Sequence, residues 1–131
     1  MRPLSFALAL CMVLAAACGD GEGSPPDSVV VTFETPEGSF MVELDDPAAI
    51  ARVQAALEGD GRAGIPNGRI VGGNGGINVG HDWHLEEVEL VDMTIEVCDG
   101  TAAYVDAHLE DYLAIGRYCP WSATVVAVEP A

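Results

Sequence analysis

A chain of 131 residues can bury one hydrophobic core and is too short for two. It has 5 basic side chains, all of them arginine, against 21 acidic ones, and its formal net charge is −16. This balance disfavours nucleic acid and anionic lipid headgroups as partners, and it favours cationic ligands or basic protein surfaces.

The first 17 residues have the three parts of an export signal. Arg2 supplies the positive charge, residues 4–17 form an apolar run, and small alanines precede Cys18. The run is too short to hold the chain across a bilayer as a helix. A cysteine directly after small residues resembles the lipidation site of bacterial lipoproteins, whose thiol receives a diacylglyceryl group. We therefore expect residues 1–17 to be a signal peptide and Cys18 to be lipidated, which places the protein in the cell envelope, outside the cytoplasm.

One position departs from the lipoprotein pattern. The leucine usually found three residues before the cysteine is Leu14, four residues before it, and Ala15 stands in the expected place. Cleavage after Ala17 at an A-x-A site is therefore the alternative, and it would give a secreted protein. Apart from the cysteine, residues 18–27 contain only glycine, proline, serine and acidic residues, so we expect a flexible tether before a single domain over residues 28–131.

The domain begins with a predicted hairpin and a helix. Apolar and polar residues alternate over residues 29–33 and 40–44, and the turn between them contains proline and glycine. Asp46 and Pro47 are typical of a helix start, and apolar residues then recur at helical spacing until Gly59.

A longer region of predicted strands follows. Residues 70–71 predict a short strand that leads into the glycine run 72–76. A phosphate-binding loop would need a following Gly-Lys-Ser/Thr and the start of a helix, and both are missing here. The glycine run therefore predicts a hairpin loop. The stretch 83–98 predicts two strands, because apolar and polar residues alternate over 87–90 and again over 94–98.

The last predicted elements are a helix and a strand. Thr101 is a candidate N-cap, apolar residues share one helical face, and Gly116 marks the end of the helix. Residues 123–128 predict the final strand. This order predicts an α+β fold, a mostly antiparallel sheet with two helices packed on one face.

The cysteines predict one disulfide. Cys11 leaves with the signal and Cys18 is the lipid candidate, which leaves Cys98 and Cys119 in an oxidising compartment. A metal site would need more ligands than two distant cysteines. A bridge that closes a loop of roughly twenty residues would stabilise the fold by about 3 kcal/mol.

Two candidate sites come from acidic residues and histidines. His81, Asp82, His84 and Glu86 resemble metal ligands, but residues three apart on a strand point to opposite faces, so we expect no metal site. Glu96 shares the predicted strand face of Cys98 and should approach the core, where a buried carboxylate needs a partner.

His84 and Arg117 are the candidate partners of Glu96 in the core. A satisfied structural network is the simpler interpretation of such a group. A hydrolase with Glu96 as base and His84 as orienter is the functional alternative. No Ser-His-Asp set with a nucleophile elbow is visible, so an enzyme is the less favoured class.

Several short motifs resemble one family. They are Trp83-His84-Leu85, Ile95-Glu96-Val97-Cys98-Asp99, Val105 and Cys119-Pro120-Trp121-Ser122. Together they are similar to the N-terminal domain of the calmodulin-binding protein called BP seventy-four, a domain that also occurs in bacterial exported proteins. The resemblance supplies no catalytic residues. It does not imply calmodulin binding here, because calmodulin typically binds a basic amphipathic helix and neither predicted helix is basic.

These observations predict an exported, lipid-anchored and non-enzymatic binding or interaction module without a cofactor. Its candidate binding residues are Trp83, His84, Glu96, Asp99 and Trp121, which we expect to converge near one end of the sheet. The alternative is a small extracytoplasmic hydrolase or metal-binding protein that uses His84 and Glu96. The expected partner is a protein or small ligand that is cationic rather than anionic, and acidity that only keeps the protein soluble would explain the charge without any partner.

Overall fold

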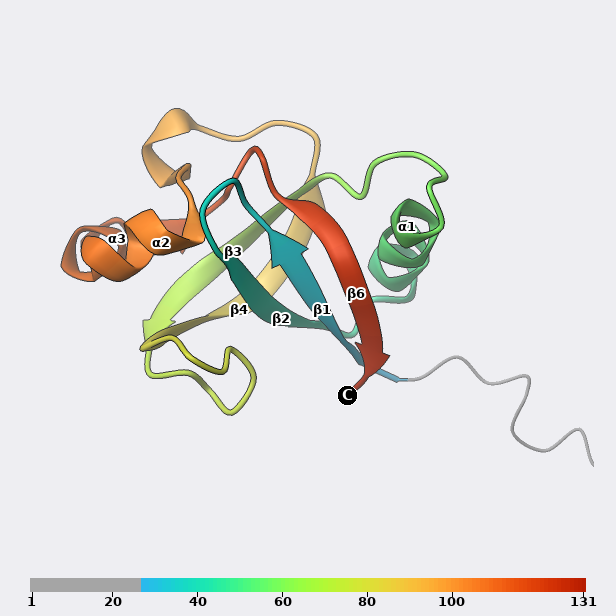
Figure 1. Cartoon of the computed structure of the whole chain (residues 1–131), viewed down its shortest axis with the longest axis horizontal. Helices are drawn as coiled ribbons and strands as arrows, with labels where there is room; N and C mark the ends of the chain where they lie inside the picture. Colours follow the sequence, from blue (N-terminus) through green and yellow to red (C-terminus); the bar gives the residue numbers. More distant parts are fainter. Residues whose placement is uncertain (1–26) are drawn as a thin grey trace, which may run out of the picture.

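The alternating hydrophobic segments build two antiparallel sheets (Figure 1). The computed structural model describes residues 27–131, so the predicted signal peptide and Cys18 lie outside the described residues. The first sheet has the strand order β2-β1-β6 and consists of Val29–Glu34 (β1), Ser39–Leu44 (β2) and Thr124–Pro130 (β6). The second has the order β4-β3-β5 and consists of Ile65–Gly72 (β3), Trp83–Val91 (β4) and Arg117–Tyr118 (β5).

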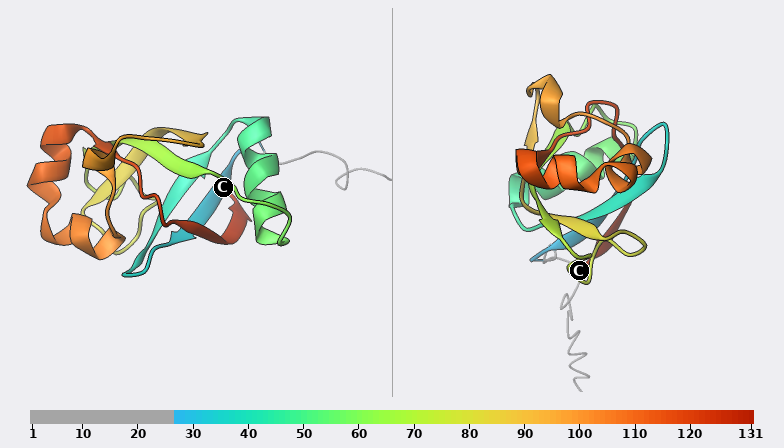
Figure 2. Two further views of the ribbon diagram at one scale, coloured as in Figure 1. Left: turned by 90° about the horizontal axis from the view of Figure 1, so that it is seen from above. Right: turned by 90° about the vertical axis from the view of Figure 1, so that its left-hand side faces the viewer.

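The helices lie at the two ends of these sheets (Figure 2). They are Pro47–Leu57 (α1), Ala102–Ala107 (α2) and Leu109–Ile115 (α3), with a short 3₁₀ turn at Glu96–Cys98 (η1). The predicted α+β class, antiparallel pairing and disulfide are confirmed, and the strands are divided between two sheets. In the described part of the chain, no helix is long and apolar enough to cross a membrane.

Local signals set the first three elements as predicted. The turn between β1 and β2 is closed by Thr35, whose hydroxyl donates to the carbonyl of Gly38 at 2.7 Å, and Gly38 has the positive φ of +90° that glycine accepts readily. Asp46 caps α1 by accepting from the Ala49 amide at 2.9 Å, and Pro47 occupies the first turn.

Two predictions about the middle of the chain were wrong. Residues 94–98 do not form a strand: the Asp99 amide donates to the Glu96 carbonyl at 3.1 Å and closes η1. The predicted helix over 101–116 is divided at His108, whose φ of −131° is not helical. The His108 ring Nδ1 lies 3.0 Å from the Tyr104 carbonyl, a side-chain bond that competes with the regular helical ladder.

Aromatic rings join the two sheets in the core. Trp83 on β4 and Tyr118 on β5 meet edge to face with their centroids 5.3 Å apart, and Phe40 on β2 lies 5.3 Å from Tyr118 and 5.8 Å from Trp83. All three side chains are buried. Such pairs contribute about 0.5–1.5 kcal/mol each beyond the burial of their surface, so this cluster is a main source of sheet-to-sheet cohesion.

The predicted hairpin loop between β3 and β4 is confirmed, and it also covers the outer edge of β2. Buried Asn78 accepts from the Met41 amide at 2.9 Å and donates to the Trp83 carbonyl at 2.9 Å. His81 Nε2 lies 2.8 Å from the Ser39 carbonyl. The loop thereby satisfies backbone groups that an edge strand would otherwise expose.

Candidate functional site

The predicted disulfide between Cys98 and Cys119 fastens two loops at one end of the molecule. Their Cα atoms are 5.1 Å apart, and the Cys119 amide donates to the Cys98 carbonyl at 2.7 Å. Cys98 is the last residue of η1, which follows the loop that leaves β4. Pro120 and Trp121 come directly after Cys119. The bridge therefore fixes Trp121 relative to the end of β4.

Trp121 is exposed but held in place. Its side chain is 43% exposed, its amide donates to Asp99 Oδ1 at 2.8 Å, and its indole Nε1 donates to Thr94 Oγ1 at 3.2 Å. The Thr94 hydroxyl also lies 2.7 Å from Cys119 Sγ. A tryptophan whose backbone amide and indole N–H are both bonded presents a rigid and largely apolar ring, as recognition residues often do.

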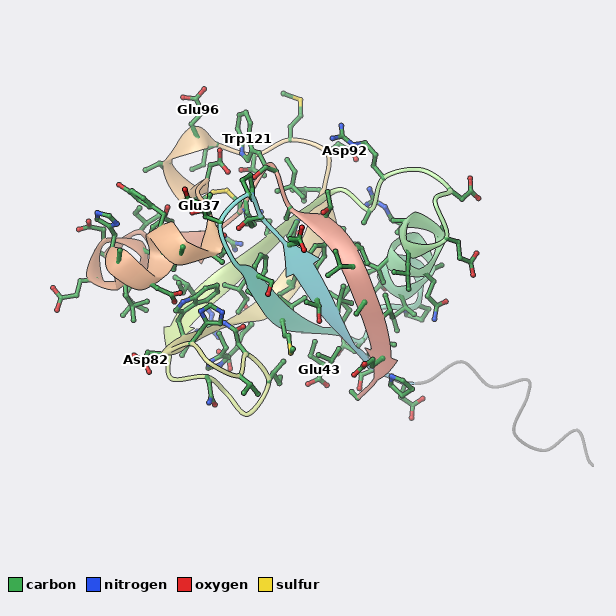
Figure 3. All side chains as sticks on the ribbon, in the orientation of Figure 1. Glu37, Glu43, Asp82, Asp92, Glu96 and Trp121 are labelled. Carbon is green, nitrogen blue, oxygen red and sulfur yellow. A yellow bond between two sulfur atoms is a disulfide. The ribbon has the colours of Figure 1, made fainter. Side chains whose placement is uncertain are left out.

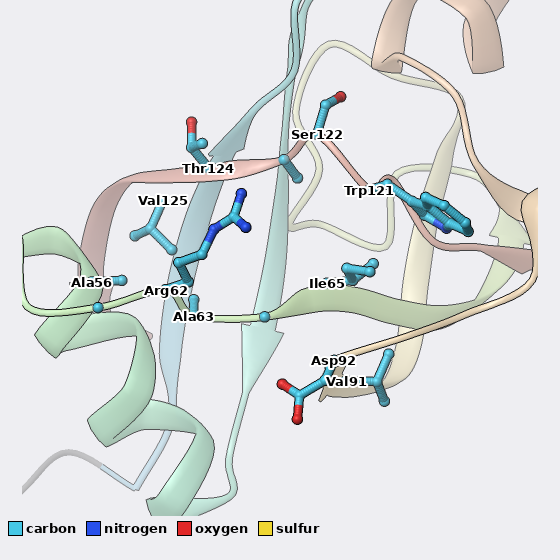
Figure 4. A pocket seen from close by; sticks show the side chains of 13 residues that line it. Ala56, Arg62, Ala63, Ile65, Val91, Asp92, Trp121, Ser122, Thr124 and Val125 are labelled. Carbon is cyan, nitrogen blue, oxygen red and sulfur yellow. The ribbon is translucent and has the colours of Figure 1, made fainter.

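Trp121 stands at the edge of a pocket of about 410 Å³, shown in Figure 4. We call this cavity the Trp121 pocket. It lies where the start of β3, the end of β4, the start of β6 and the end of α1 meet, and its lining residues are Ala56, Gly61, Arg62, Ala63, Gly64, Ile65, Val91, Asp92, Trp121, Ser122, Ala123, Thr124 and Val125. Most of these side chains are apolar or small, and two charged groups are added at the opening.

Those two groups are Arg62 and Asp92. Asp92 pairs with Arg52 at 3.3 Å, in a contact whose two side chains are 91% and 40% exposed and which contributes little to stability. Arg62 makes no ion pair with any other described residue. Figure 4 shows its side chain extending toward Ser122 and Thr124. The pocket thus combines an apolar interior with a few polar groups at its rim, as ligand sites commonly do.

Large apolar side chains surround the same end of the molecule. Met93 is 86% exposed, and Ile95 and Val97 are also exposed on the loop that leads to Cys98. An apolar loop in water beside a pocket and an exposed tryptophan is typical of a protein interaction surface.

Two tyrosine hydroxyls fix the segment that carries Asp99. Tyr112 donates to the Asp99 carbonyl at 2.5 Å, and Tyr118 donates to the Gly100 carbonyl at 2.9 Å. Burial raises the pKa of both phenols, so both hydroxyls stay protonated as donors at neutral pH.

Trp83, the first predicted site residue, belongs to the core. It is fully buried, and its indole Nε1 donates to Asp106 Oδ1 on α2 at 2.7 Å. The same carboxylate oxygen lies 2.7 Å from Nδ1 of His81. Trp83 therefore ties β4 to α2 and offers no surface to a ligand.

His84 also has a local structural role. Its Nδ1 lies 2.6 Å from the Gly73 carbonyl, which can only accept, so this nitrogen carries the proton and donates. Its Nε2 lies 3.7 Å from Glu86 Oε1. His84 thus anchors the start of the loop between β3 and β4.

The expectation that Glu96 approaches the core is wrong. Glu96 is exposed on η1, because the turn replaces the strand that would have directed it inward. Neither candidate partner meets it: His84 contacts Gly73 and Glu86, and Arg117 donates to Asn67 Oδ1 at 3.0 Å. Figure 3 shows Glu96 and Trp121 at one end and Asp82, two residues before His84, on the opposite side.

The five predicted residues are therefore divided. Asp99 and Trp121 are bonded to each other, and Glu96 lies close in the chain through its carbonyl bond to the Asp99 amide. Trp83 and His84 lie elsewhere. Among residues 27–131, no three His, Cys, Asp or Glu side chains are grouped so that they could hold a metal ion.

Sequence reasoning missed most of the pocket. Arg62, Ala63 and Thr124 come from segments that look like ordinary loop or strand in sequence, and no local pattern indicates that they meet. Thr94, which contacts both sulfur atoms of the disulfide and the Trp121 indole, was missed as well.

One of three comparisons with known proteins finds a match. The family model described as the BP seventy-four N-terminal domain matches residues 27–131, which are the residues that the structure describes. No curated protein and no solved structure matches the chain.

Proposed function

The chain belongs to the BP seventy-four N-terminal domain family, and we propose that it is a non-enzymatic binding module that captures a partner at the Trp121 pocket. The observation that carries this proposal is the bonded, exposed indole of Trp121 beside a cavity of about 410 Å³. A ring that is already fixed loses little conformational entropy when a partner covers it. Tryptophan is also among the residues that most often dominate binding energy.

The shape of the pocket favours an apolar group as the anchor of the partner. Ile65, Val91 and Val125 line it, and Val125 packs against the core. Burial of a partner's aliphatic or aromatic side chain there would contribute about 1.5–3 kcal/mol. The exposed Met93 and Ile95 would extend the contact outside the pocket.

The two ends of the described chain leave the Trp121 pocket clear of the proposed lipid anchor. Val29 pairs with Pro130, so both ends of the described chain lie together, at the end of the sheets away from Trp121 (Figures 1 and 3). In our proposal the protein is exported and anchored through a lipid on Cys18. The attachment point then lies at the end of the domain opposite the Trp121 pocket, and the net charge of −16 of the full chain favours a partner that is cationic rather than anionic.

Nothing in the arrangement of the described residues favours the alternative of a hydrolase or metal-binding protein. That alternative needs His84 and Glu96 in one site. His84 instead donates to Gly73, and Glu96 points into solvent from η1.

A peptide-display selection tests the binding function. A random peptide library would be selected on the wild-type protein, and the enriched peptides would then be measured by calorimetry on wild type and on Trp121→Ala. We expect the substitution to weaken binding about tenfold or more, because it removes the central contact. The matched control is Leu113→Ala on α3, a side chain of similar exposure away from the pocket.

Two outcomes would count against the proposal. One is that no peptide is enriched over a blank surface after repeated rounds. The other is that enriched peptides bind Trp121→Ala as tightly as wild type while both variants keep the wild-type melting temperature, since the binding surface would then lie elsewhere.

A further inference from the structure

A second cavity, of about 370 Å³, lies between the β1–β2 turn and the start of α2. We call it the tyrosine notch. Its lining residues are Pro36 and Glu37 in the turn, Asp99, Gly100 and Thr101 after η1, Tyr104 on α2 and Tyr112 on α3. It contains two carboxylates and two aromatic rings, and no basic side chain lines it.

Both carboxylates lack a cationic partner. No ion pair among residues 27–131 includes Glu37 or Asp99. Asp99 accepts the backbone amide of Trp121 through Oδ1, a bond that orients the carboxylate without neutralising its charge. The notch, a shallow depression open to solvent, therefore keeps a negative charge that no side-chain cation compensates, and this charge attracts a cation.

The helix start beside the notch offers no site to an anion. The first amides of α2 are already bonded within the protein: Ala102 donates to Thr35 Oγ1 at 3.1 Å, Ala103 to the Glu37 carbonyl at 2.9 Å and Tyr104 to Thr101 Oγ1 at 3.1 Å. No donor of the first turn is left for a phosphate or carboxylate. The same bonds hold the turn that carries Glu37 against α2, so the notch is pre-formed.

The aromatic rings suit a flat cation. Tyr104 is 51% exposed and is itself supported by the His108 ring, which stacks on it with centroids 3.9 Å apart. Tyr112 meets Tyr104 edge to face at 6.2 Å, and its hydroxyl is bonded to Asp99. A cation over the face of Tyr104 that His108 does not cover would gain about 0.5–1 kcal/mol from the ring quadrupole, which is a factor of about two to five in affinity.

We propose that the tyrosine notch binds the guanidinium group of an arginine side chain presented by a partner. A guanidinium has five N–H donors and no acceptor, which matches a notch lined by two carboxylates without a cationic partner. Its plane stacks on an aromatic ring, and it sheds water more easily than an ammonium group. The neutral isostere of arginine, citrulline, keeps the shape and loses the charge.

This site can be tested separately from the Trp121 pocket. Asp99 is the only side chain that serves both, since it lines the notch and orients the backbone of Trp121. The notch needs no contact with the indole, so the two proposals can fail separately.

The test is a titration of the mature protein with N-acetyl-arginine methylamide, followed through the backbone NMR signals of Gly100 and Thr101. We expect saturable shifts of these two signals, and binding of the citrulline analogue at least about fivefold weaker. Glu37→Gln, Asp99→Asn and Tyr104→Leu should each weaken arginine binding about two- to fivefold. Asp99→Asn keeps an amide oxygen that can accept from Trp121, so the local fold is preserved.

The matched control is Glu43→Gln, which removes one charge from an exposed position on β2, away from the notch (Figure 3). It should leave the titration unchanged, as should Trp121→Ala. The proposal is overturned if Glu43→Gln weakens binding as much as Glu37→Gln, because the attraction would then be diffuse. It is equally overturned if citrulline binds as well as arginine, if the lysine analogue binds as tightly, or if the signals of Gly100 and Thr101 do not respond.

Discussion

The carboxylate of Asp99 accepts the backbone amide of Trp121 at 2.8 Å, across 22 residues of sequence. This bond joins the chain leaving η1 to the turn after Cys119, beside the disulfide that joins the same two segments. It explains how an exposed tryptophan is kept at the rim of its pocket. It also makes Asp99 the residue on which both candidate binding surfaces depend.

Removal of this acceptor should loosen the Trp121 turn. Asp99→Ala leaves the Trp121 amide without its charged partner, and we expect a loss of about 1 kcal/mol in the free energy of unfolding, because the site is only partly buried. Asp99→Asn should lose less, since its side-chain oxygen can still accept. Urea unfolding of the three proteins checks this order, and equal stability of Asp99→Ala and wild type would contradict it.

Reduction of the disulfide should cost a large part of the stability. Cys98 and Cys119 are 21 residues apart, which corresponds to about 3 kcal/mol in the chain-entropy model. Unfolding in urea with and without a reductant measures the difference. The control is a variant with both cysteines replaced by alanine, whose stability should not respond to the reductant. Titration of the unreduced, unfolded protein should find neither of the two thiols free.

Asn78 should be among the most sensitive polar positions. Asn78→Ala leaves the Met41 amide and the Trp83 carbonyl without partners in a buried site. Unsatisfied buried groups cost about 1–3 kcal/mol each, so we expect a total loss of about 2–6 kcal/mol. The control in the same loop is Asn74→Ala, an exposed residue that accepts from the Gly76 amide and should cost less than about 1 kcal/mol. Thermal or urea unfolding would disprove this account if the two variants were equally stable.

The fold should lose stability in alkaline solution. Burial raises the pKa of the Tyr118 phenol above its usual value, so above about pH 10 this group ionises in the unfolded chain and stays protonated in the folded one. The folded state then binds more protons, and stability that is fully present below about pH 10 falls as the pH rises further, by about 1.4 kcal/mol per pH unit.

Urea unfolding at several pH values between about 8 and about 11 measures this slope. Tyr118→Phe should be less stable at neutral pH, because it loses the bond to the Gly100 carbonyl, but its stability should fall less steeply above about pH 10. A slope equal to that of wild type would mean that Tyr118 is not the group responsible.

The proposed anchor predicts a specific mature N-terminus. The exported protein should begin at Cys18, carry the mass of its lipid groups and partition into the detergent phase. Cys18→Ser should move it to the aqueous fraction, because no other lipid anchor is proposed. A wild-type protein that begins at Cys18 without added mass would support simple secretion instead.

The sequence determined the elements whose signals are local. The β1–β2 hairpin follows from alternation and from the glycine in its turn, α1 follows from the Asp46 cap and Pro47, and β6 follows from its run of valines. The disulfide followed from the export signal and from the cysteine count. Each of these inferences needs only neighbouring residues or composition.

Tertiary structure decided the elements whose partners are distant. Residues 94–98 alternate like a strand, but their chain must bring Cys98 within 5.1 Å of Cys119, so it leaves the sheet edge and turns. β3 contains Pro66 and Gly68, which disfavour a strand in isolation. A Cβ atom at Gly68 would lie 3.0 Å from side-chain atoms of Leu85 and Val88, so the close approach of β4 favours glycine there.

The same reason explains why the binding surfaces could be predicted only in part. Asp99 and Trp121 were recognisable because they flank the two bridged cysteines, whereas the walls of the Trp121 pocket come from α1, β3, β4 and β6, which meet only in the folded protein. Glu37 and Tyr104 likewise face one cavity because the Glu37 carbonyl binds the Ala103 amide. Contacts between segments far apart in the chain depend on sheet order and core packing, and the local periodicity of the sequence predicts neither of them.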